Sequence, residues 1–314
     1  MGKILVNDGI HPDGQKMMEK AGFTVVTTKI PQEELSQKLP EFDAICVRSA
    51  TKVRQALIDS CPNLKVIARG GVGLDNIDVD YAKSKSIQVI NTPAASSEAV
   101  AELAFAHIYT LSRSLHKANR EMKDGDFKTL KKSYAKGAQL RGKTIGIIGL
   151  GRIGQETARI ALSLGMEVLP VDKMIEKATI NLKLGGGLAP VAVELKTTDM
   201  DTMLASSDYI SVHVPFSGGK PLIGKEEIQK LKDGTILVNT ARGGTYDESA
   251  LLEGLASGKL AGVGLDVFEN EPTPRKELLN HPDISVSPHI GAATLEAQRN
   301  IGLELAEKII KVLK

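Results

Sequence analysis

Three polar side chains that could carry acid–base chemistry follow three short apolar runs in the second half of the chain. Arg242 stands in the stretch NTARGG, Glu271 in DVFENEP and His289 in SPHIGAAT. Removing a hydride from C2 of a 2-hydroxy acid also releases the hydroxyl proton, which needs a base, and histidine titrates near neutral pH. A carboxylate beside the ring would orient it and stabilise its protonated form. A planar arginine fork could hold the substrate carboxylate or polarise the C2 oxygen.

Each of these residues also has an ordinary structural explanation. A histidine after proline is often a solvated loop residue, and an arginine in a glycine-rich loop often binds backbone carbonyls. A glutamate next to proline is often a surface charge. The catalytic interpretation is favoured because all three follow strands of one predicted sheet, whose carboxyl edge is where ligands bind in doubly wound folds.

A glycine-rich loop earlier in the chain has the pattern that holds the phosphates of a dinucleotide. Gly149, Gly151 and Gly154 form G-x-G-x-x-G, with Arg152 and Ile153 between the last two. An apolar run precedes the loop and a segment of helical period follows it, which is the context that gives this pattern meaning. The first glycine allows the tight turn, the second admits the pyrophosphate and the third lets the helix pack on the strand. The phosphates would then lie at the positive end of that helix.

A carboxylate at the end of the next predicted strand indicates which dinucleotide binds. Asp172 lies eighteen residues beyond Gly154. It could accept hydrogen bonds from the adenine-ribose hydroxyls and would repel the 2′-phosphate of NADP. A solvated strand-end aspartate is the alternative, and the adjacent Lys173 weakens the distinction between NAD and NADP. The glycine loop favours the ribose role, so NAD is the expected cofactor.

Short β-branched runs alternate with segments of helical period along almost the whole chain. This alternation predicts parallel sheets with helices on both faces. The strands expected in the first third are Lys3–Asp8, Phe23–Thr28, Ala44–Ser49, Leu64–Arg69 and Gln88–Asn91. Six more, the number in a complete dinucleotide-binding sheet, are Thr144–Gly149, Glu167–Asp172, Tyr209–Val214, Thr235–Thr240, Gly262–Val267 and Ile284–Ser287.

Two segments interrupt this alternation. A long helical pattern runs from Ser97 to about Met122 and is followed by a polar, lysine-rich stretch up to Lys143. Residues Lys173–Thr198 contain the glycine cluster Leu184–Leu188 between alternating apolar positions. We expect a β-hairpin there in place of a crossover helix. The segment that ends the chain, residues 294–314, is predicted to be an amphipathic helix.

Composition excludes several classes of protein. The chain has 314 residues, enough for two domains, and its net charge of +2 is too small to indicate nucleic acid or an anionic membrane as partner. No apolar stretch approaches the roughly 20 residues that span a bilayer, and no export signal precedes the first strand. Cys46 and Cys61 have neither metal-site spacing nor the pattern of a disulfide framework. We therefore expect a cytoplasmic protein.

With these motifs in place, the chain resembles the D-isomer-specific 2-hydroxyacid dehydrogenases. The resemblance rests on the N-x-A-R-G, D-V-F-E and S-P-H-I-G stretches and covers nearly the whole chain, from residue 47 to residue 293. It implies that Arg242, Glu271 and His289 are the catalytic trio and that Asp266 holds the nicotinamide carboxamide. It also implies that two further loops line the cofactor, through His213, Val214, Pro215, Thr240 and Ala241. His213 could be a rival base, but in that family the corresponding histidine lies along the cofactor.

The same resemblance implies two discontinuous domains. Residues 97–287 would form a Rossmann-type NAD-binding domain with a doubly wound parallel sheet. Residues 1–96 and 288–314 would form a flavodoxin-like α/β substrate-binding lid, whose closure would expel water and align C2 with the nicotinamide. The loop Gly70–Gly73 could present backbone N–H groups to the substrate carboxylate. The stretch Arg113–Arg141 corresponds to a dimer-forming arm of the family, so a homodimer is expected.

Within the family, the chain most resembles the short-type D-3-phosphoglycerate dehydrogenases, which oxidise 3-phosphoglycerate to 3-phosphohydroxypyruvate in serine biosynthesis. This resemblance rests on VRSATKV from residue 47 and RGGVGLDN from residue 69. The implied substrate contacts come from Arg48, Ser49, Arg69, Gly71, Val72 and Asn91. The two arginines would hold the phosphate, while Lys52 and Arg54 could assist or only solvate the start of a helix. Longer members carry a regulatory domain after the last helix, and neither that domain nor serine feedback through it is expected here.

The chain departs from the family pattern in two places, the Lys173–Thr198 insert and Phe127, where many members have tryptophan. Neither touches the expected chemistry. The main alternatives within the class are a glyoxylate/hydroxypyruvate reductase and a D-lactate dehydrogenase. Outside the class, a non-enzymatic NAD-sensing protein like the corepressor relatives of the family is the alternative. It is disfavoured because the sequence shows no long disordered tail or added interaction module.

Overall fold

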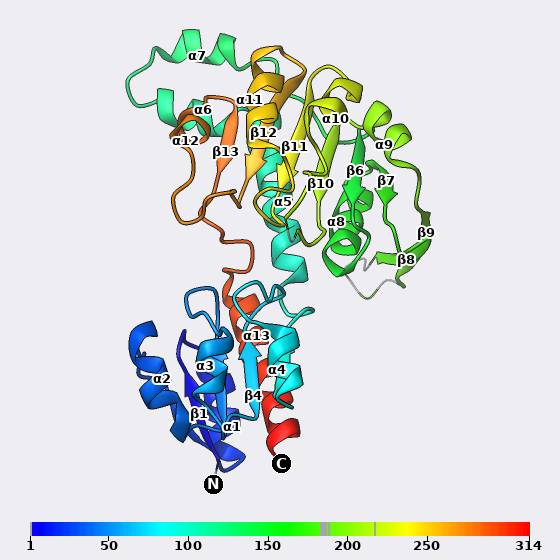
Figure 1. Cartoon of the computed structure of the whole chain (residues 1–314). Helices are drawn as coiled ribbons and strands as arrows, with labels where there is room; N and C mark the ends of the chain where they lie inside the picture. Colours follow the sequence, from blue (N-terminus) through cyan, green and yellow to red (C-terminus); the bar gives the residue numbers. More distant parts are fainter. Residues whose placement is uncertain (1, 183–186, 188, 217) are drawn as a thin grey trace. The chain divides into compact units, whose positions relative to one another are not determined.

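The computed structural model describes residues 2–182, 187, 189–216 and 218–314 (Figure 1). The chain forms two compact units. The first comprises Met1–Ala99 and Ala292–Lys314, and the second comprises Val100–Gly291. The division predicted from the sequence, at residues 96/97 and 287/288, lies three or four residues before each of these boundaries. Each unit has its own parallel sheet and its own hydrophobic core.

The first unit is built on a five-stranded parallel sheet with the order β2-β1-β3-β4-β5. This is the flavodoxin-like order, so the α/β fold predicted for this part of the chain is confirmed. All five strands lie where the sequence alternation predicts them. Their bounds are Lys3–Val6 (β1), Thr24–Val26 (β2), Ala44–Val47 (β3), Val66–Arg69 (β4) and Gln88–Asn91 (β5).

Helices cover both faces of this sheet because alternate side chains along each strand point to opposite faces. Leu5 and Ile45 pack on the face covered by α2, α3 and α4, whereas Ile4 and Ala44 pack on the face covered by α1 and α13. No helix in the described ranges combines the length and the apolar character that crossing a bilayer requires. The helices of this unit are Pro12–Lys20 (α1), Leu35–Lys38 (α2), Gln55–Asp59 (α3), Val79–Ser84 (α4) and Leu295–Leu313 (α13).

The second unit is built on a six-stranded parallel sheet with the order β13-β12-β11-β10-β6-β7. The chain steps outward from β6 to β7 and then continues on the other side of β6 with β10, so the strand order reverses between β6 and β10. The six strands predicted from the sequence are confirmed. Their bounds are Thr144–Ile148 (β6), Glu167–Val171 (β7), Tyr209–Val212 (β10), Thr235–Asn239 (β11), Leu260–Leu265 (β12) and Ile284–Val286 (β13).

Two helical layers also cover this second sheet. Ile145 and Ile147 of β6 point to the face covered by α5 and α8, whereas Ile210 and Val212 of β10 point to the face covered by α9, α10 and α11. The helices are Ser97–Ser112 (α5), Leu115–Glu121 (α6), Phe127–Ser133 (α7), Arg152–Ser163 (α8), Met200–Ser206 (α9), Lys225–Lys230 (α10), Glu248–Ala256 (α11) and Lys276–Asn280 (α12).

The helical segment predicted from Ser97 to about Met122 is helical in the structure, but as two helices and not as one. Helix α5 ends at Ser112, the backbone of Ser114 is left-handed with φ of 49°, and a separate helix α6 follows. The cause is a tertiary contact, because the N–H of Ala138 donates to the Ser112 carbonyl at 2.9 Å. A continuing helix would need that carbonyl for its own residue four positions on.

The hairpin predicted after β7 is confirmed in its strands. Strands β8 (Lys177–Leu182) and β9 (Val191–Lys196) pair in antiparallel register, and Ile180 is buried in the core beside α8. The predicted turn Leu184–Leu188 lies, apart from Gly187, outside the described residues. One correction applies, because the short helix α9 follows the hairpin before β10. The connection from β7 to β10 therefore contains both the hairpin and a helix, and the hairpin does not replace the crossover helix.

Candidate active site

The carboxyl ends of the strands in the second unit carry most of the residues singled out in the sequence. Gly149 follows β6, Asp172 follows β7 and His213 follows β10. The strand order reverses between β6 and β10, and such a reversal opens a ligand crevice at the carboxyl edge of a sheet. The loops after β11, β12 and β13 begin at the same edge.

The backbone of the loop after β6 requires glycine at two of its three glycine positions and leaves open space at the third. Gly149 has a φ of +97°, which side chains disfavour. A Cβ on Gly154 would lie 1.9 Å from the Gly149 carbonyl oxygen, so only glycine lets α8 pack this close. A Cβ on Gly151 would meet nothing within 4 Å. Gly151 is also the N-cap of α8 and supplies no side-chain cap. The N-terminus of α8 therefore opens onto free space.

Asp172 is held firmly at the end of β7. Its Oδ2 accepts a hydrogen bond from the Leu150 N–H at 2.7 Å, within the glycine loop, and its Oδ1 accepts from the N–H groups of Met174 at 2.8 Å and Ile175 at 3.0 Å. Burial raises the pKa of Asp172, but these backbone hydrogen bonds outweigh it, and the pKa lies below its usual value. The carboxylate therefore stays charged and is tied directly to the phosphate loop.

His213, after β10, is placed beneath the glycine loop rather than in reach of acid–base work. Its Nε2 lies 3.0 Å from both Thr157 Oγ1 and Ser211 Oγ. Burial lowers the pKa of His213 to about 3, so the ring stays neutral near pH 7. The next residue, Val214, packs against the loop, since a Cβ on Gly149 would lie 2.6 Å from its Cγ1.

These features together fit a dinucleotide. The open space at Gly151 and the uncapped N-terminus of α8 suit a pyrophosphate, because the first N–H groups of a helix and its dipole favour an anion. The ionised Asp172 beside the loop suits ribose hydroxyls. The residues present at this edge therefore match the requirements of NAD.

The loop after β11 is shaped by Asn239 and Gly243. The Asn239 side chain donates from Nδ2 to the Arg242 carbonyl at 2.8 Å and accepts from the Ala241 N–H at 3.0 Å. A Cβ on Gly243 would lie 1.9 Å from the Phe268 carbonyl oxygen, so glycine lets this loop touch the loop after β12. The guanidinium of Arg242 is thereby fixed close to the residues that follow Phe268, and its Nη1 donates to the Ala241 carbonyl at 2.6 Å.

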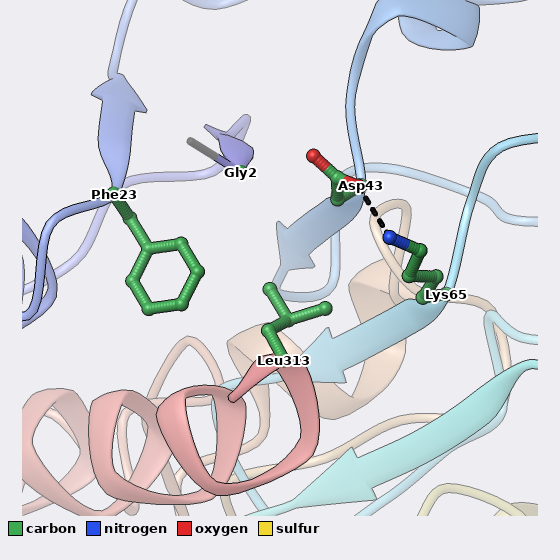
Figure 2. A pocket seen from close by; sticks show the side chains of 5 residues that line it. All are labelled: Gly2, Phe23, Asp43, Lys65 and Leu313. Carbon is green, nitrogen blue, oxygen red and sulfur yellow. Dashed lines mark hydrogen bonds and ion pairs between the residues drawn. The ribbon is translucent and has the colours of Figure 1, made fainter.

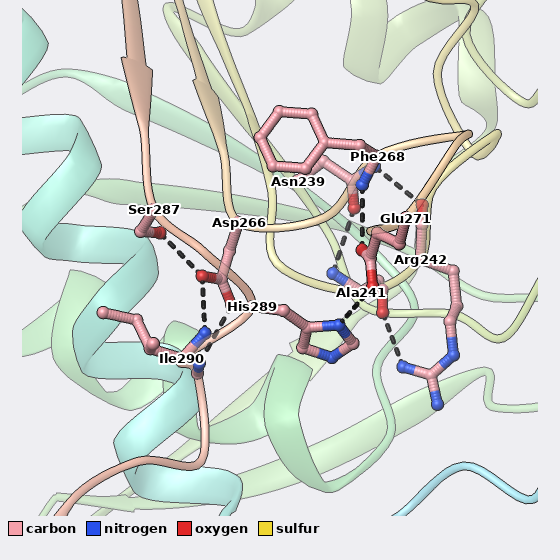
Figure 3. Close-up of polar contacts among 10 residues, drawn as sticks. Asn239, Ala241, Arg242, Asp266, Phe268, Glu271, Ser287, His289 and Ile290 are labelled. Carbon is pink, nitrogen blue, oxygen red and sulfur yellow. Dashed lines mark hydrogen bonds and ion pairs between the residues drawn. The ribbon is translucent and has the colours of Figure 1, made fainter. Parts of the chain in front are cut away.

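His289 and Glu271 form a direct pair (Figure 3). Nδ1 of His289 lies 2.8 Å from Oε2 of Glu271, and Oε1 of Glu271 accepts from the Phe268 N–H at 3.0 Å. Burial raises the pKa of Glu271, but the bond to His289, the charges of His289 and Arg242 and the bond from Phe268 outweigh it and leave the pKa below its usual value. A carboxylate only accepts, so Nδ1 carries the hydrogen and Nε2 of the neutral ring is free to take a proton.

Asp266, at the end of β12, organises the backbone around His289. Its Oδ1 accepts from the Ile290 N–H at 2.8 Å and its Oδ2 from the Gly291 N–H at 2.9 Å. Its carbonyl oxygen accepts from the His289 N–H at 2.8 Å. His289 has a left-handed backbone with φ of 54°, and this conformation persists because its neighbours are fixed. Ser287 completes the set by donating to Oδ1 at 2.6 Å (Figure 3).

The sequence alone did not single out two of these supporting residues, Asn239 and Ser287. Both stand inside the stretches that drew attention to Arg242 and His289. An asparagine that ends a strand before a glycine-rich turn often bonds its own backbone two residues on, and this signal could have indicated Asn239. The role of Ser287 depends on a contact with Asp266 that is distant in sequence, so no local signal points to it.

The residues expected to bind substrate lie in the first unit, at the ends of β3, β4 and β5. The Arg48 N–H donates to Asp8 Oδ2 at 2.7 Å, and its guanidinium Nη1 donates to Gln298 Oε1 at 2.7 Å. Asn76 Nδ2 donates to the carbonyls of Arg48, at 2.7 Å, and Thr51, at 2.6 Å. The loop that contains Arg48 and Ser49 is thus fixed from both sides.

The loop after β4 is fixed by contacts with the end of β5. Gly71 has a φ of +134°, and its N–H donates to Thr92 Oγ1 at 2.8 Å. The Asn91 side chain donates to the Val72 carbonyl at 2.7 Å. The N–H of Gly71 is therefore already used within the protein, which changes the expectation that the whole loop offers its N–H groups to a carboxylate.

Arg54 does not extend the basic site. Its Nη1 donates to Asp78 Oδ1 at 2.8 Å and its Nη2 to the Asp75 carbonyl at 2.9 Å. This agrees with the alternative in which Arg54 belongs to the start of helix α3.

A separate pocket of about 250 Å³ lies at the opposite, amino-terminal edge of the first sheet (Figure 2). Gly2, Phe23, Asp43, Lys65 and Leu313 line it. Its two charged side chains bond to each other, with Lys65 Nζ 2.9 Å from Asp43 Oδ1, and Asp43 also accepts from the Lys3 N–H. The charges in this pocket are satisfied by the protein itself.

Comparison with known proteins gives a consistent picture. Residues 105–291 match the model of the NAD binding domain of D-isomer specific 2-hydroxyacid dehydrogenases. The chain is 43% identical to hydroxypyruvate reductase of Thermotoga maritima, over 99% of this chain and 98% of that protein. It is 42% identical to D-3-phosphoglycerate dehydrogenase of Archaeoglobus fulgidus, over 99% of this chain but 57% of that protein. The chain therefore spans a little over half the length of this second relative.

Solved structures agree with these matches. A glyoxylate reductase from Paecilomyes thermophila superimposes with a TM-score of 0.81 at 30% identity, covering 98% of this chain and 94% of that one. The TT0316 protein from Thermus thermophilus superimposes with a TM-score of 0.84 at 28% identity, covering 99% of this chain and 96% of that one. From its NAD-binding domain and its full-length relatives, the chain belongs to the D-isomer-specific 2-hydroxyacid dehydrogenases, a family of NAD-dependent enzymes.

Proposed function

We propose that this enzyme oxidises D-3-phosphoglycerate to 3-phosphohydroxypyruvate with NAD. The observation that carries the proposal is the pair of arginines, Arg48 and Arg69, at the carboxyl ends of the adjacent strands β3 and β4. In the register of these strands Val47 lies opposite Arg69, so Arg48 comes one residue beyond. The Gly70 N–H continues the pairing by donating to the Val47 carbonyl at 2.9 Å.

Arginines at the ends of two adjacent strands suit a dianion. A phosphate offers several oxygens to planar N–H forks, whereas the methyl group of lactate offers nothing that an arginine can bind. A guanidinium has five N–H donors, and the bond from Arg48 to Gln298 engages one of its nitrogens. The basic pair at this edge therefore favours an acid with a phosphorylated tail.

In the second unit, the proposed chemistry uses three side chains. His289 Nε2 takes the proton of the C2 hydroxyl as the C2–H bond breaks, and Glu271 holds the resulting imidazolium through the 2.8 Å bond to Nδ1. Arg242 binds the substrate carboxylate and polarises the C2 oxygen. The hydride passes to NAD, which is the chemistry that the cofactor supplies when bound. In the reverse direction, protonated His289 returns its proton to the C2 oxygen.

A second candidate is reduction of hydroxypyruvate to D-glycerate. The relative that is 43% identical over nearly its full length carries the name hydroxypyruvate reductase, and Arg54 is engaged by Asp78 and does not strengthen the basic site. The two candidates share the C2 chemistry and differ only in the group on C3. Whether the arginines at the ends of β3 and β4 bind a phosphate on C3 therefore distinguishes the two candidate substrates.

The test compares 3-phosphoglycerate with D-glycerate by NADH absorbance, for the wild type and for the variants Arg48→Gln and Arg54→Gln. We expect kcat/KM for 3-phosphoglycerate to exceed that for D-glycerate by about 100-fold, since bidentate charged contacts are worth about 1.5–3 kcal/mol each. Arg48→Gln should lose about tenfold or more on the phosphorylated acid only. Arg54→Gln is the matched control and should behave like wild type. Indifference to the phosphate would reject the phosphoglycerate assignment in favour of hydroxypyruvate.

We also propose that the enzyme is a homodimer through residues 113–141. The support is a group of large apolar side chains on and beside α6 and α7 that are half or more exposed, namely Leu115 at 54%, Met122 at 51% and Phe127 at 64%. Exposed apolar groups gathered on one segment mark protein contacts. Light scattering of the purified enzyme measures this directly, and a monomer at micromolar concentration would contradict it.

A further inference from the structure

A histidine that the chemistry above does not use is buried beneath the loop that bears His289. His107 lies on α5 and is 4% exposed. The helix can approach the sheet there because β12 presents two glycines to it. A Cβ on Gly264 would lie 2.7 Å from the His107 Cβ, and a Cβ on Gly262 would lie 2.9 Å from Cδ2 of Leu111, one helical turn further on. The close approach brings the imidazole to the level of β13.

The two ring nitrogens of His107 join two serines. Nδ1 lies 2.9 Å from Ser285 Oγ, and Nε2 lies 3.0 Å from Ser287 Oγ. The serines are two residues apart in the extended chain at β13, so their hydroxyls face the same side. Ser287 in turn donates to Oδ1 of the buried Asp266 at 2.6 Å. A continuous path of hydrogen bonds therefore runs from Ser285 to the Asp266 carboxylate.

The direction of every bond in this path follows from its last member. An ionised carboxylate only accepts, so the Ser287 hydroxyl gives its one hydrogen to Asp266 and must accept from His107. Nε2 of His107 therefore carries the hydrogen, and Nδ1 of the neutral ring accepts from Ser285. Burial lowers the pKa of His107, which the nearby charge of Asp266 opposes and that of His116 reinforces, and this favours the neutral ring.

We infer that His107 is a positioning residue that acts through Ser287 and Asp266 to fix the backbone that bears His289. Asp266 holds the N–H groups of Ile290 and Gly291 on its two carboxylate oxygens and the His289 N–H on its carbonyl. The inference rests on the proposed role of His289 and on the cofactor contact that the family resemblance implies for Asp266. With the Nε2–H donor in place, Ser287 can donate only toward Asp266, so the carboxylate has one orientation.

A purely space-filling role for His107 predicts different behaviour. If the ring only fills the gap above the glycines, any side chain of similar volume should serve, and the identity of its polar atoms should not matter. If it acts by donating to Ser287, an amide nitrogen at the Nε2 position should substitute for it, and one at the Nδ1 position should not. His107→Gln and His107→Asn differ in this way.

The experiment measures kcat, KM and NADH affinity for His107→Gln, His107→Asn, Ser287→Ala and the double variant His107→Asn/Ser287→Ala. We expect His107→Asn and Ser287→Ala each to lower kcat about tenfold and to weaken NADH binding severalfold, as the loss of one charge-assisted hydrogen bond implies. His107→Gln should stay within about threefold of wild type. The double variant should be no worse than Ser287→Ala, because the two residues act in one path.

Two further measurements separate this role from general packing. Leu111→Ala, one turn along the same helix above Gly262, should lower Tm while kcat stays within about twofold, since Leu111 has no polar link to Asp266. In ¹⁵N spectra of the histidine-labelled wild-type enzyme, the His107 ring should show the Nε2–H tautomer. This readout needs no variant and no substrate.

Equal losses in His107→Gln and His107→Asn, multiplicative losses in the double variant, or an Nδ1–H tautomer would each overturn the inference. The variants are compared on whichever acid the wild type turns over, and NADH binding is measured without any acid. Failure of the phosphoglycerate assignment would therefore appear in the wild-type substrate panel and leave these ratios readable.

Discussion

Both units place their loops of interest at the carboxyl edge of a parallel sheet, but the two edges are held in different ways. In the second unit, side-chain bonds such as those of Asp266 are joined by backbone contacts that only glycine permits. An added Cβ would lie 1.9 Å from a carbonyl oxygen at Gly154, within the loop after β6, and at Gly243, between the loops after β11 and β12. In the first unit, side chains fasten the loops. Asp8 accepts from the N–H groups of Arg48 and Thr51, and Asn76 donates to the carbonyls of the same two residues.

The difference corresponds to two kinds of task. Proton transfer needs its groups placed to within about 0.5 Å of the productive geometry, and loops in backbone contact can provide such precision. Holding a charged tail needs the right charge within reach of a long arginine side chain, and loops fastened by side chains suffice for that. We therefore expect substitutions at the second edge to affect the reaction itself and substitutions at the first edge to affect which acid is accepted.

The largest expected effect lies in the acid–base pair. His289→Asn removes the nitrogen that takes the proton, and we expect kcat to fall by about 10²-fold or more. NADH should bind with nearly unchanged affinity, because the side chain of His289 bonds to Glu271 and the backbone contacts with Asp266 remain. His116→Asn, at a half-buried histidine that contacts the Pro282 carbonyl, is the control and should retain activity. Retained turnover in His289→Asn would exclude the proposed base.

In the glycine loop after β6, one substitution should affect mainly protein stability and another should affect mainly cofactor binding. Gly154→Ala should destabilise the cofactor-free protein by about 1–3 kcal/mol, because its methyl group would overlap the Gly149 carbonyl. Gly151→Ala should leave that stability nearly unchanged, since Gly151 has an ordinary φ of −69° and open space around its Cβ position. It should nevertheless weaken NADH binding strongly, because the methyl group occupies the approach of the pyrophosphate.

Thermal unfolding without cofactor and NADH fluorescence titration read these two outcomes separately. If Gly151→Ala bound NADH like the wild type, the pyrophosphate would not lie against this loop. If Gly154→Ala were as stable as the wild type, the backbone contact would not be what holds α8 to the strand.

Much of this architecture follows from local sequence. The alternation of β-branched runs predicts all eleven strands of the two parallel sheets, because buried parallel strands need such runs. The glycine loop and the strand-end positions of His289, Glu271 and Arg242 follow from the same pattern, since the carboxyl ends of the strands share one edge. The roles of these residues remain predictions until the variants are measured.

The features that could not be predicted from local sequence depend on contacts between segments that are distant in the chain. The helix predicted through Met122 stops at Ser112 because Ala138 returns to take its carbonyl. The N–H of Gly71 is taken by Thr92, twenty-one residues away. His107 looks like any residue on the inner face of a helix, and its link to Asp266 arises only when α5 packs over the glycines of β12. Such contacts leave no periodic or motif signal in the sequence.

The smallest expected effect concerns a buried carboxylate, Glu248, at the carboxyl edge of the second sheet, where one of its two oxygens lacks a hydrogen-bond partner among the described residues. Glu248, the first residue of α11, is 4% exposed, and its Oε1 accepts from the Glu269 N–H at 2.9 Å. Its buried Oε2 has no hydrogen-bond partner among the described residues. Burial raises the pKa of Glu248, and the charge of Glu269 adds to this, although the bond from the Glu269 N–H opposes it.

A raised pKa in the folded state means that the folded protein holds this proton when the unfolded chain has released it. The protein therefore loses stability as the pH rises from 4.5, the usual pKa of the glutamate in the unfolded chain, through the higher pKa of Glu248 in the folded protein. Glu248→Gln keeps the Oε1 acceptor and removes the charge. We expect the variant to match the wild type near pH 4 and to exceed its Tm by about 2–4 °C at pH 8, the shift that about 1 kcal/mol produces in a domain of this size.

Glu253→Gln, on the same helix, is the matched control, because its exposed carboxylate pairs with Lys225 at 2.7 Å and gains nothing from losing its charge. Melting curves at several pH values would show a difference that grows with pH for Glu248→Gln alone. A constant difference, or one that shrinks as pH rises, would mean that the Glu248 carboxylate is well accommodated when charged. The second edge would then have no strained acid, and its loops would be held by the glycine contacts without opposition.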